Sequence, residues 1–184
     1  MGNLIQTMSG WDYSLVDDRC LEHEGCIVDL GCLDWDWSKF FIGKKRIVGA
    51  DPYEKQIDGV EFYNGVVYNY NGKIYLTNKG IASSIYDKGG DEFDVITWKN
   101  FCEKFDIDEI SVLKLNIEGA EYDLLKSMDS SDFEKIDQIA VSFHDWLNPA
   151  WSEQTKECME LLNKNNFSIQ PIFLQFGWYL AIKN

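Results

Sequence analysis

Basic residues are scarce in this sequence. Its 184 residues include 17 lysines and arginines against 31 aspartates and glutamates, which gives a formal net charge of −14. Proteins that bind nucleic acids need basic surfaces to displace the counterions around phosphates. The charge balance therefore argues against DNA or RNA as a partner and favours a neutral or cationic substrate.

Long hydrophobic runs are also missing. No apolar stretch approaches the ~20 residues that cross a bilayer, and MGNLIQTMSG at the start has neither the basic residues nor the apolar core of a signal peptide. We therefore expect no membrane span and a cytoplasmic location. The length predicts one domain, residues 1–184, with residues 1–25 as an N-terminal lid or packing segment. It is also compatible with one domain of a longer enzyme.

Cysteines are few, odd in number and without a CxxC pair: there are five. Cys20-x-x-His23-x-x-Cys26 contains metal-ligand residue types, but no fourth ligand lies nearby and Cys26 begins an apolar strand. Buried reduced thiols are the favoured interpretation, and no metal site is predicted.

The chain is organised around residues 26–38, CIVDLGCLDWDWS. The apolar run formed by its first three residues is too short and too rich in β-branched side chains for a helix, and it predicts a buried central strand. Gly31 follows this strand, where a missing Cβ permits a sharp turn or the close approach of a ligand. In open α/β sheets cofactors bind at this carboxyl end. Asp51 ends a second strand, predicted over 44–51 and stopped by Pro52, at a position where acids hold ribose hydroxyls.

The remaining pattern predicts strands at 60–70, 73–77, 110–117, 136–143, 167–176 and 177–182, and helices at 94–105, 121–128 and 151–165. Asn71-Gly72 indicates a hairpin between its flanking strands, and the last two strands should pair antiparallel. We thus predict an α/β fold with a mostly parallel seven-stranded sheet and an antiparallel carboxyl-terminal hairpin. This resembles the Rossmann-like class I methyltransferases, whose strand order is 3-2-1-4-5-7-6.

Residues 112–125, VLKLNIEGAEYDLL, resemble the FkbM family of S-adenosylmethionine-dependent O-methyltransferases. Its members carry LKIDxEGxExxxL after a DxGxxxGxxS turn, and the resemblance runs over roughly residues 26–146. The matching positions are Asp29, Gly31, Ser38, Asp51, Pro52, Ser83, Ser84, Glu118, Gly119, Glu121 and the His-Asp-Trp of residues 144–146. Two residues depart from the pattern: Trp35 stands at the second glycine of the turn, and Asn116 replaces the acid of LKID.

The resemblance implies S-adenosylmethionine as the cofactor and a hydroxyl as the methyl acceptor, on a small molecule or more specifically a sugar or glycan. Asp29 and Gly31 are expected at the amino-acid end of the cofactor and Asp51 at its ribose. The full set of expected cofactor residues is Asp29, Gly31, Cys32, Ser38, Asp51, Pro52, Ser83, Ser84 and Glu118.

The residues expected to catalyse the transfer are His144, Glu118 and Asp145. A methyl group on a sulfonium is already activated, so the enzyme must align the acceptor oxygen and remove its proton. An imidazole with a pKa near neutrality suits that base, and a structural His144 held by Asp145 or by a backbone carbonyl is the alternative. Glu118 could position the acceptor or hold the cofactor amine, and with Glu121 it also suits the first turn of a helix.

Oxygen ligands for Mg²⁺ could come from Asn116, Glu118 and Asp145, although no ligand spacing requires a metal. Trp35, Trp37 and Trp146 are predicted to bind the substrate, because a sugar stacks its C–H face on an aromatic ring. A second small core around the N-terminal segment is the alternative for these rings. A rival function is a catalytically degenerate methyltransferase fold that serves as a binding module, with Trp35 blocking the cofactor turn.

Overall fold

The protein is described here by a computed structural model that covers residues 2–6, 15–77 and 89–184. Its main sheet has seven strands in the spatial order β11-β12-β10-β9-β3-β4-β5. Their bounds are β3 (Cys26–Leu30), β4 (Ile47–Ala50), β5 (Glu61–Tyr63), β9 (Ile110–Leu115), β10 (Ile136–Ser142), β11 (Phe167–Phe173) and β12 (Trp178–Lys183). Five adjacent strands are mutually parallel: β10, β9, β3, β4 and β5. β12 is antiparallel to both of its neighbours, β10 and β11.

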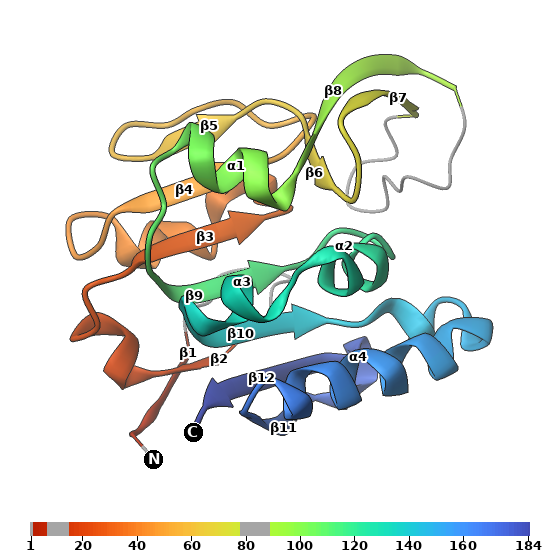
Figure 1. Ribbon diagram of the computed structural model, residues 1–184. Helices are drawn as coiled ribbons and strands as arrows, with labels where there is room; N and C mark the ends of the chain where they lie inside the picture. The colour runs from red at the N-terminus through yellow and green to blue at the C-terminus, as the bar shows by residue number, and fades with distance from the viewer. Residues whose placement is uncertain (1, 7–14, 78–88) are drawn as a thin grey trace.

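This arrangement confirms the α/β fold with a mostly parallel sheet and an antiparallel carboxyl-terminal pair. Numbered along the chain within this sheet, the strands lie in the order 3-2-1-4-5-7-6. Outside this order, five further strands of the described residues form two separate small sheets. In Figure 1 the arrows of β3, β9 and β10 point to the same side, so their carboxyl ends meet at one edge.

Each face of the sheet has its own core. On one face pack the helices α1 (Trp98–Lys104), α2 (Glu121–Ser127), α3 (Ser130–Glu134) and α4 (Ser152–Lys164), which lie toward the viewer in Figure 1. On the other face lie the short 3-10 turns η1 (Asp18–Leu21), η2 (Leu33–Trp35) and η3 (Ser38–Phe41). Because successive strand residues point to opposite faces, Val28 and Leu30 enter the helical core, whereas Ile27 enters the other.

The N-terminal segment packs on the 3-10 side. β1 (Leu4–Gln6) and β2 (Leu15–Asp17) pair antiparallel. The N–H of Asp17 donates to Gln138 Oε1 at 2.9 Å, and Gln138 Nε2 donates to the carbonyl of Asp17 at 3.0 Å. Since buried polar groups need partners, this reciprocal pair anchors β2 on β10.

A three-stranded sheet corrects the prediction for residues 60–97. β6 (Val66–Tyr68) is parallel to β8 (Asp91–Thr97), and β7 (Gly72–Leu76) is antiparallel to β8. The hairpin expected at Asn71-Gly72 is therefore wrong, because β8 lies between the two strands that flank this turn. The single strand expected at 60–70 is divided between two sheets, and the helix expected from residue 94 begins at Trp98, where Thr97 Oγ1 accepts the N–H of Asn100 at 3.3 Å.

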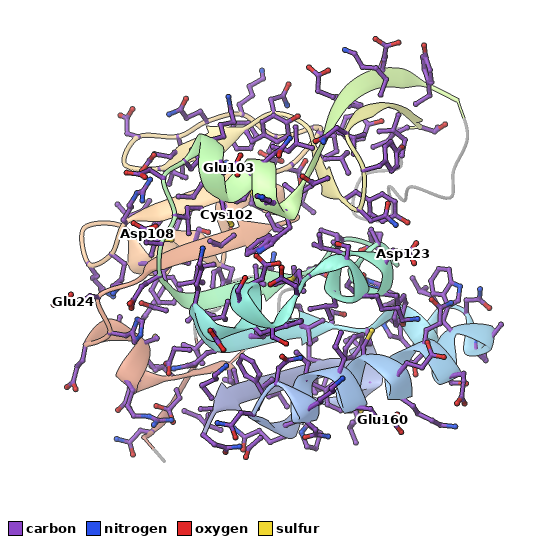
Figure 2. The ribbon with its side chains drawn as sticks, viewed as in Figure 1. Glu24, Cys102, Glu103, Asp108, Asp123 and Glu160 are labelled. Atoms are coloured by element: carbon purple, nitrogen blue, oxygen red, sulfur yellow. The ribbon has the colours of Figure 1, made fainter. Side chains whose placement is uncertain are left out.

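Two hydroxyl groups tie this small sheet to the carboxyl edge of the main one. Tyr68 donates to the carboxylate of Asp123 on α2, a residue labelled in Figure 2. Tyr53, just after β4, donates to the carbonyl of Leu76 at 2.7 Å. The small sheet thus adjoins the segments that follow β4 and β9. The remaining short turns are η5 (His144–Trp146), η6 (Pro149–Trp151) and η7 (Leu174–Phe176).

Candidate functional site

Gly31 turns the chain at the carboxyl end of β3. Its φ is 78°, and an added Cβ would lie 2.0 Å from the carbonyl oxygen of Asn116. Backbone bonds hold the turn on both sides: Gly31 N–H donates to Ala50 O at 3.0 Å, and Asn116 N–H donates to Leu30 O at 3.1 Å. Only glycine suits this left-handed, crowded position, so the turn is held closely between the ends of β4 and β9.

Asp29 and Ser38 support this turn from within the 3-10 core. Both are fully buried, and Ser38 Oγ donates to Asp29 Oδ2 at 2.5 Å. Lys114 Nζ lies 3.0 Å from Asp29 Oδ1 and donates to the carbonyl of Gly31 at 2.7 Å. The expected cofactor residues Asp29 and Ser38 thus have side chains bound to other protein groups, and their influence on a ligand would pass through the turn.

Lys114 was not among the residues predicted from the sequence. It is 1% exposed and lies opposite Asp29 in the register of β3 and β9. A buried ammonium requires a charge partner and hydrogen bonds. The available signal was a lysine in the middle of an otherwise apolar strand, ISVLKL.

Trp35 and Trp37 are core residues, so the prediction that they present their rings to a substrate is wrong. They are 2% and 1% exposed. The Trp35 ring packs on Gly49, where an added Cβ would lie 2.4 Å from it, and Trp35 Nε1 donates to the carbonyl of Lys55 at 2.8 Å. The ring centroids of Trp37 and Phe41 are 5.0 Å apart. These rings cover an apolar face of the sheet, and removing their apolar surface from water stabilises the fold.

The backbone at Trp35 has a conformation that suits the glycine of the FkbM pattern at this position. Asp34 and Trp35 have φ values of 55° and 56°, the left-handed region that glycine adopts without a steric penalty. Cys32, at the same turn, is also buried, and burial raises the pKa of its thiol well above the usual value. The side chains of Cys32 and Trp35 therefore pack in the core beneath the turn.

Asp51 lies at the end of β4, one strand away from Gly31. Its Oδ1 accepts the N–H groups of Tyr53 at 2.8 Å and Glu54 at 3.1 Å, which fixes the carboxylate in a local turn. Burial raises the pKa of Asp51. Asp51 and the neighbouring Pro52 are both half-buried. The expected serines Ser83 and Ser84 lie outside the described residues.

Two glutamates that follow β9 enclose one histidine that follows β10. His144 Nδ1 lies 3.0 Å from Glu121 Oε1, and His144 Nε2 lies 3.3 Å from Glu118 Oε1. Glu121 is fully buried and also accepts the N–H groups of Gly119, at 3.0 Å, and His144, at 3.2 Å. Glu118 keeps 18% of its side chain exposed. We name Glu118, Glu121 and His144 the carboxylate–imidazole cluster.

The backbone at Glu118 is unusual. Its φ is 53° and that of Gly119 is 98°, so two successive residues are left-handed at the end of β9. Such a conformation costs a non-glycine residue about 1–3 kcal/mol and persists where the surrounding structure holds it. The glutamate carboxylates suit a helix N-terminus, but the strained backbone aims Glu118 at His144 instead of along α2.

His144 is not a neutral base in this structure. Burial lowers its pKa, but the carboxylates of Glu121 and Glu118 outweigh burial and raise the pKa to about 10. At neutral pH the imidazole is therefore protonated, with a carboxylate beside each ring nitrogen. Because the fold places an acid against each ring nitrogen, this arrangement favours a positioning role for His144 over the predicted removal of the acceptor's proton.

A pH series tests this protonated state. Because the pKa of His144 rises from 6.5 to about 10 on folding, its stabilising contribution is fully present below pH 6.5 and is lost as the pH rises through 10. We expect the difference in unfolding free energy between wild type and His144→Gln to shrink from pH 7 to pH 10 in urea titrations. The variant retains all five cysteines, so thiol titration cancels in the difference. A pH-independent difference would contradict the assignment.

The two residues after His144 differ in exposure. Asp145 is half-buried. The pKa of Tyr179 is raised by burial of its hydroxyl and, to a smaller extent, by the negative charge of Asp145. Trp146 is 42% exposed, with its ring centroid 6.0 Å from that of His144 and 5.3 Å from that of Phe176. Trp146 is therefore the exposed member of the three tryptophans expected at the substrate, and it lies beside the carboxylate–imidazole cluster.

Metal binding, membrane insertion and further cavities concern other regions of the described part of the chain. No group of three or more His, Cys, Asp or Glu residues there is placed to hold a metal ion, and none of its helices is long and apolar enough to cross a membrane. A cavity of about 320 Å³ lies at the amino ends of β3, β4 and β9 and is lined by residues including Glu24 and Asp108. Figure 2 shows both residues at the edge opposite Asp123.

Comparison with known proteins agrees with this architecture. No curated protein sequence matches the chain. The crystal structure of methyltransferase FkbM from Methylobacillus flagellatus KT is similar, with a TM-score of 0.58 and 14% identity over 86% of this chain and 43% of that chain. A ribosomal protein L11 methylase from Lactobacillus delbrueckii subsp. bulgaricus aligns with a TM-score of 0.41 and 15% identity, over 91% of this chain and 74% of that one.

The chain thus spans less than half the length of the solved FkbM methyltransferase. At sequence level, residues 44–169 match the Methyltransferase FkbM domain. The match covers more than half of the 184 residues and begins after the Gly31 turn. With the sheet order and the sequence match in agreement, the chain belongs to the FkbM methyltransferase domain family.

Proposed function

We propose that this protein is an S-adenosylmethionine-dependent O-methyltransferase that acts on a hydroxyl group of a sugar or glycan. The observation that carries the proposal is the position of Glu118: a partly exposed carboxylate held by the protonated His144 at the carboxyl end of β9. Gly31 lies at the end of the adjacent strand, so the expected cofactor turn and the carboxylate share one edge.

The residues present fit such a cofactor. The Gly31 turn lies at the carboxyl end of β3, the end at which open α/β sheets bind their ligands, and Asp51 offers a carboxylate fixed by two N–H groups for the ribose hydroxyls. Pro52, and Ser83 with Ser84 beyond the described ranges, remain proposed neighbours. S-Adenosylmethionine supplies a methyl group already activated by its sulfonium.

Glu118 receives the proton of the acceptor hydroxyl in this proposal. The Glu118 carboxylate is held in position by His144 Nε2. The histidine ring is in turn oriented by the buried Glu121, which lies beside Nδ1. His144 is thus a positioning residue. Because the carboxylate and imidazolium are held before the substrate arrives, little reorganisation is needed when the proton moves.

The proposed acceptor class rests on Trp146. An exposed indole with Phe176 at its edge offers an apolar ring face, on which the C–H face of a sugar can stack. The net charge of −14 suits a neutral acceptor better than an anionic one. The five unpaired cysteines suit the reducing cytoplasm, which we propose as the location, and we propose residues 1–184 as a single methyltransferase domain.

Calorimetric titration with S-adenosylmethionine and S-adenosylhomocysteine tests the function. We expect saturable binding in the micromolar range, about −8 kcal/mol. Asp51→Ala should weaken binding at least about tenfold by removing hydrogen bonds to the ribose, whereas Asp51→Asn keeps the acceptor for Tyr53 and Glu54 and should have a smaller effect.

The matched control is Asp108→Ala, which removes one acid at the opposite edge and should leave both affinities unchanged. A folded wild-type protein that binds neither compound would contradict the proposed function and favour the binding-module alternative. Binding that Asp51→Ala does not alter would contradict only the ribose assignment. With binding established, methyl transfer from the labelled cofactor to a panel of sugars would test the acceptor class.

A further inference from the structure

We infer that Lys114 is a positioning residue for the cofactor: its ammonium group orients the Gly31–Cys32 peptide that binds the amino-acid end of S-adenosylmethionine. This inference rests on the proposed function. It concerns a buried cation that the proposed methyl transfer does not itself use.

The contacts of Lys114 converge on the turn. Nζ donates to the carbonyl of Gly31 at 2.7 Å and lies 3.0 Å from Asp29 Oδ1, while Asp29 Oδ2 accepts from Ser38 at 2.5 Å. Asp29, Ser38 and Lys114 are each no more than 1% exposed. Removing charges from water is costly, and apolar residues often replace a buried ion pair without loss of stability. The ion pair alone is thus a weak reason for a lysine here, whereas the bond to Gly31 gives the lysine a directional role.

The direction follows from peptide geometry. The C=O and N–H of a planar trans peptide point in opposite directions. With the Gly31 carbonyl held by Lys114, the N–H of Cys32 in the same peptide points away from the lysine. Gly31 is left-handed and lacks a Cβ, so without the lysine the peptide that follows it, Gly31–Cys32, would have a wider choice of orientation. A donor fixed in advance binds a carboxylate, such as that of the cofactor's amino acid, with less loss of entropy.

Three variants separate this role from simple neutralisation of Asp29: Asp29→Asn, Asp29→Asn/Lys114→Met and Asp29→Asn/Lys114→Gln. Affinity for S-adenosylhomocysteine is measured by calorimetry, and stability by thermal unfolding without ligand. We expect Asp29→Asn/Lys114→Met to unfold near the wild-type temperature, because no unpaired charge remains, but to bind at least about tenfold more weakly than Asp29→Asn. The glutamine variant, which keeps a side-chain N–H donor, should bind more tightly than the methionine variant.

Leu162→Ala is the control for destabilisation, because it removes a fully buried side chain on α4 far along the sheet from the turn. Its affinity should match wild type although its unfolding temperature falls. If Asp29→Asn/Lys114→Met binds as well as Asp29→Asn, Lys114 only balances a charge and the inference is overturned. If wild type itself binds neither S-adenosylmethionine nor S-adenosylhomocysteine, the result contradicts the proposed function and therefore also this inference.

Discussion

Replacing Glu118 with glutamine is expected to lower kcat by about 10²- to 10⁴-fold, the usual contribution of a positioned proton acceptor. Glutamine has nearly the same shape and can still accept a bond from His144 Nε2, which lies 3.3 Å from the carboxylate. It cannot take up the acceptor's proton. We expect the dissociation constant of S-adenosylhomocysteine to stay within about twofold of wild type, because the assigned role concerns the acceptor.

The measurement is initial-rate kinetics with an acceptor from the sugar panel, together with calorimetry of the same preparations. Glu153→Gln is the matched control, because Glu153 is an exposed carboxylate on α4 whose partner is Lys156. This control should leave kcat unchanged. A Glu118→Gln enzyme with full turnover would remove Glu118 from the reaction. A selective loss of cofactor affinity would instead assign Glu118 to the amine of the cofactor.

Replacing Glu121 with leucine is expected to lower the free energy of unfolding by about 3–5 kcal/mol at pH 7, the usual result of removing one member of a buried ion pair. Glu121 is fully buried and accepts the N–H groups of Gly119 and His144 as well as the His144 ring. Leucine leaves these donors without an acceptor and leaves the imidazolium with Glu118 as its remaining carboxylate. Urea unfolding followed by circular dichroism measures the loss.

Two further variants identify the cause of that loss. Glu121→Gln keeps a side-chain oxygen for Gly119 and should therefore be less destabilised than Glu121→Leu. Glu121→Leu/His144→Leu removes the buried cation together with its partner, so it should recover part of the lost stability. If the double variant is destabilised by the sum of both single changes, the two side chains do not interact. That additivity would contradict the carboxylate–imidazole cluster.

Much of the main sheet was predictable because its signals are local. The run Cys26–Val28 is short, apolar and β-branched, and Gly31 follows it at a point where the chain must turn. The alternation of Asp29 and Val28 between two faces follows from strand geometry alone. The carboxyl-terminal strands β11 and β12 are adjacent in sequence, so their antiparallel pairing needed only a tight connection.

The small sheet could not be predicted in the same way. Asn71-Gly72 is a strong hairpin signal, but β8 pairs with both flanking strands and separates them. Residues 94–97 have apolar positions that also suit a helix, and pairing with β6 and β7 decides for a strand. Propensity yields to such long-range pairing, because hydrogen bonds to a neighbouring strand satisfy the backbone equally well.

For the candidate site, the residue types that gather at one edge could be predicted from the sequence: Gly31 after β3, Asp51 after β4, Glu118 after β9 and His144 after β10. Parallel strands bring their carboxyl ends together, so this followed from strand positions. Their protonation and burial, in contrast, depend on contacts between segments that are distant in the sequence. Two glutamates more than 20 residues from His144 keep it protonated, because charge interactions depend on distance in space and on burial. Long-range packing also buries Trp35 and Trp37, because their rings cover an apolar face of the sheet. Lys114 reaches Gly31 because β9 lies beside β3 in the sheet.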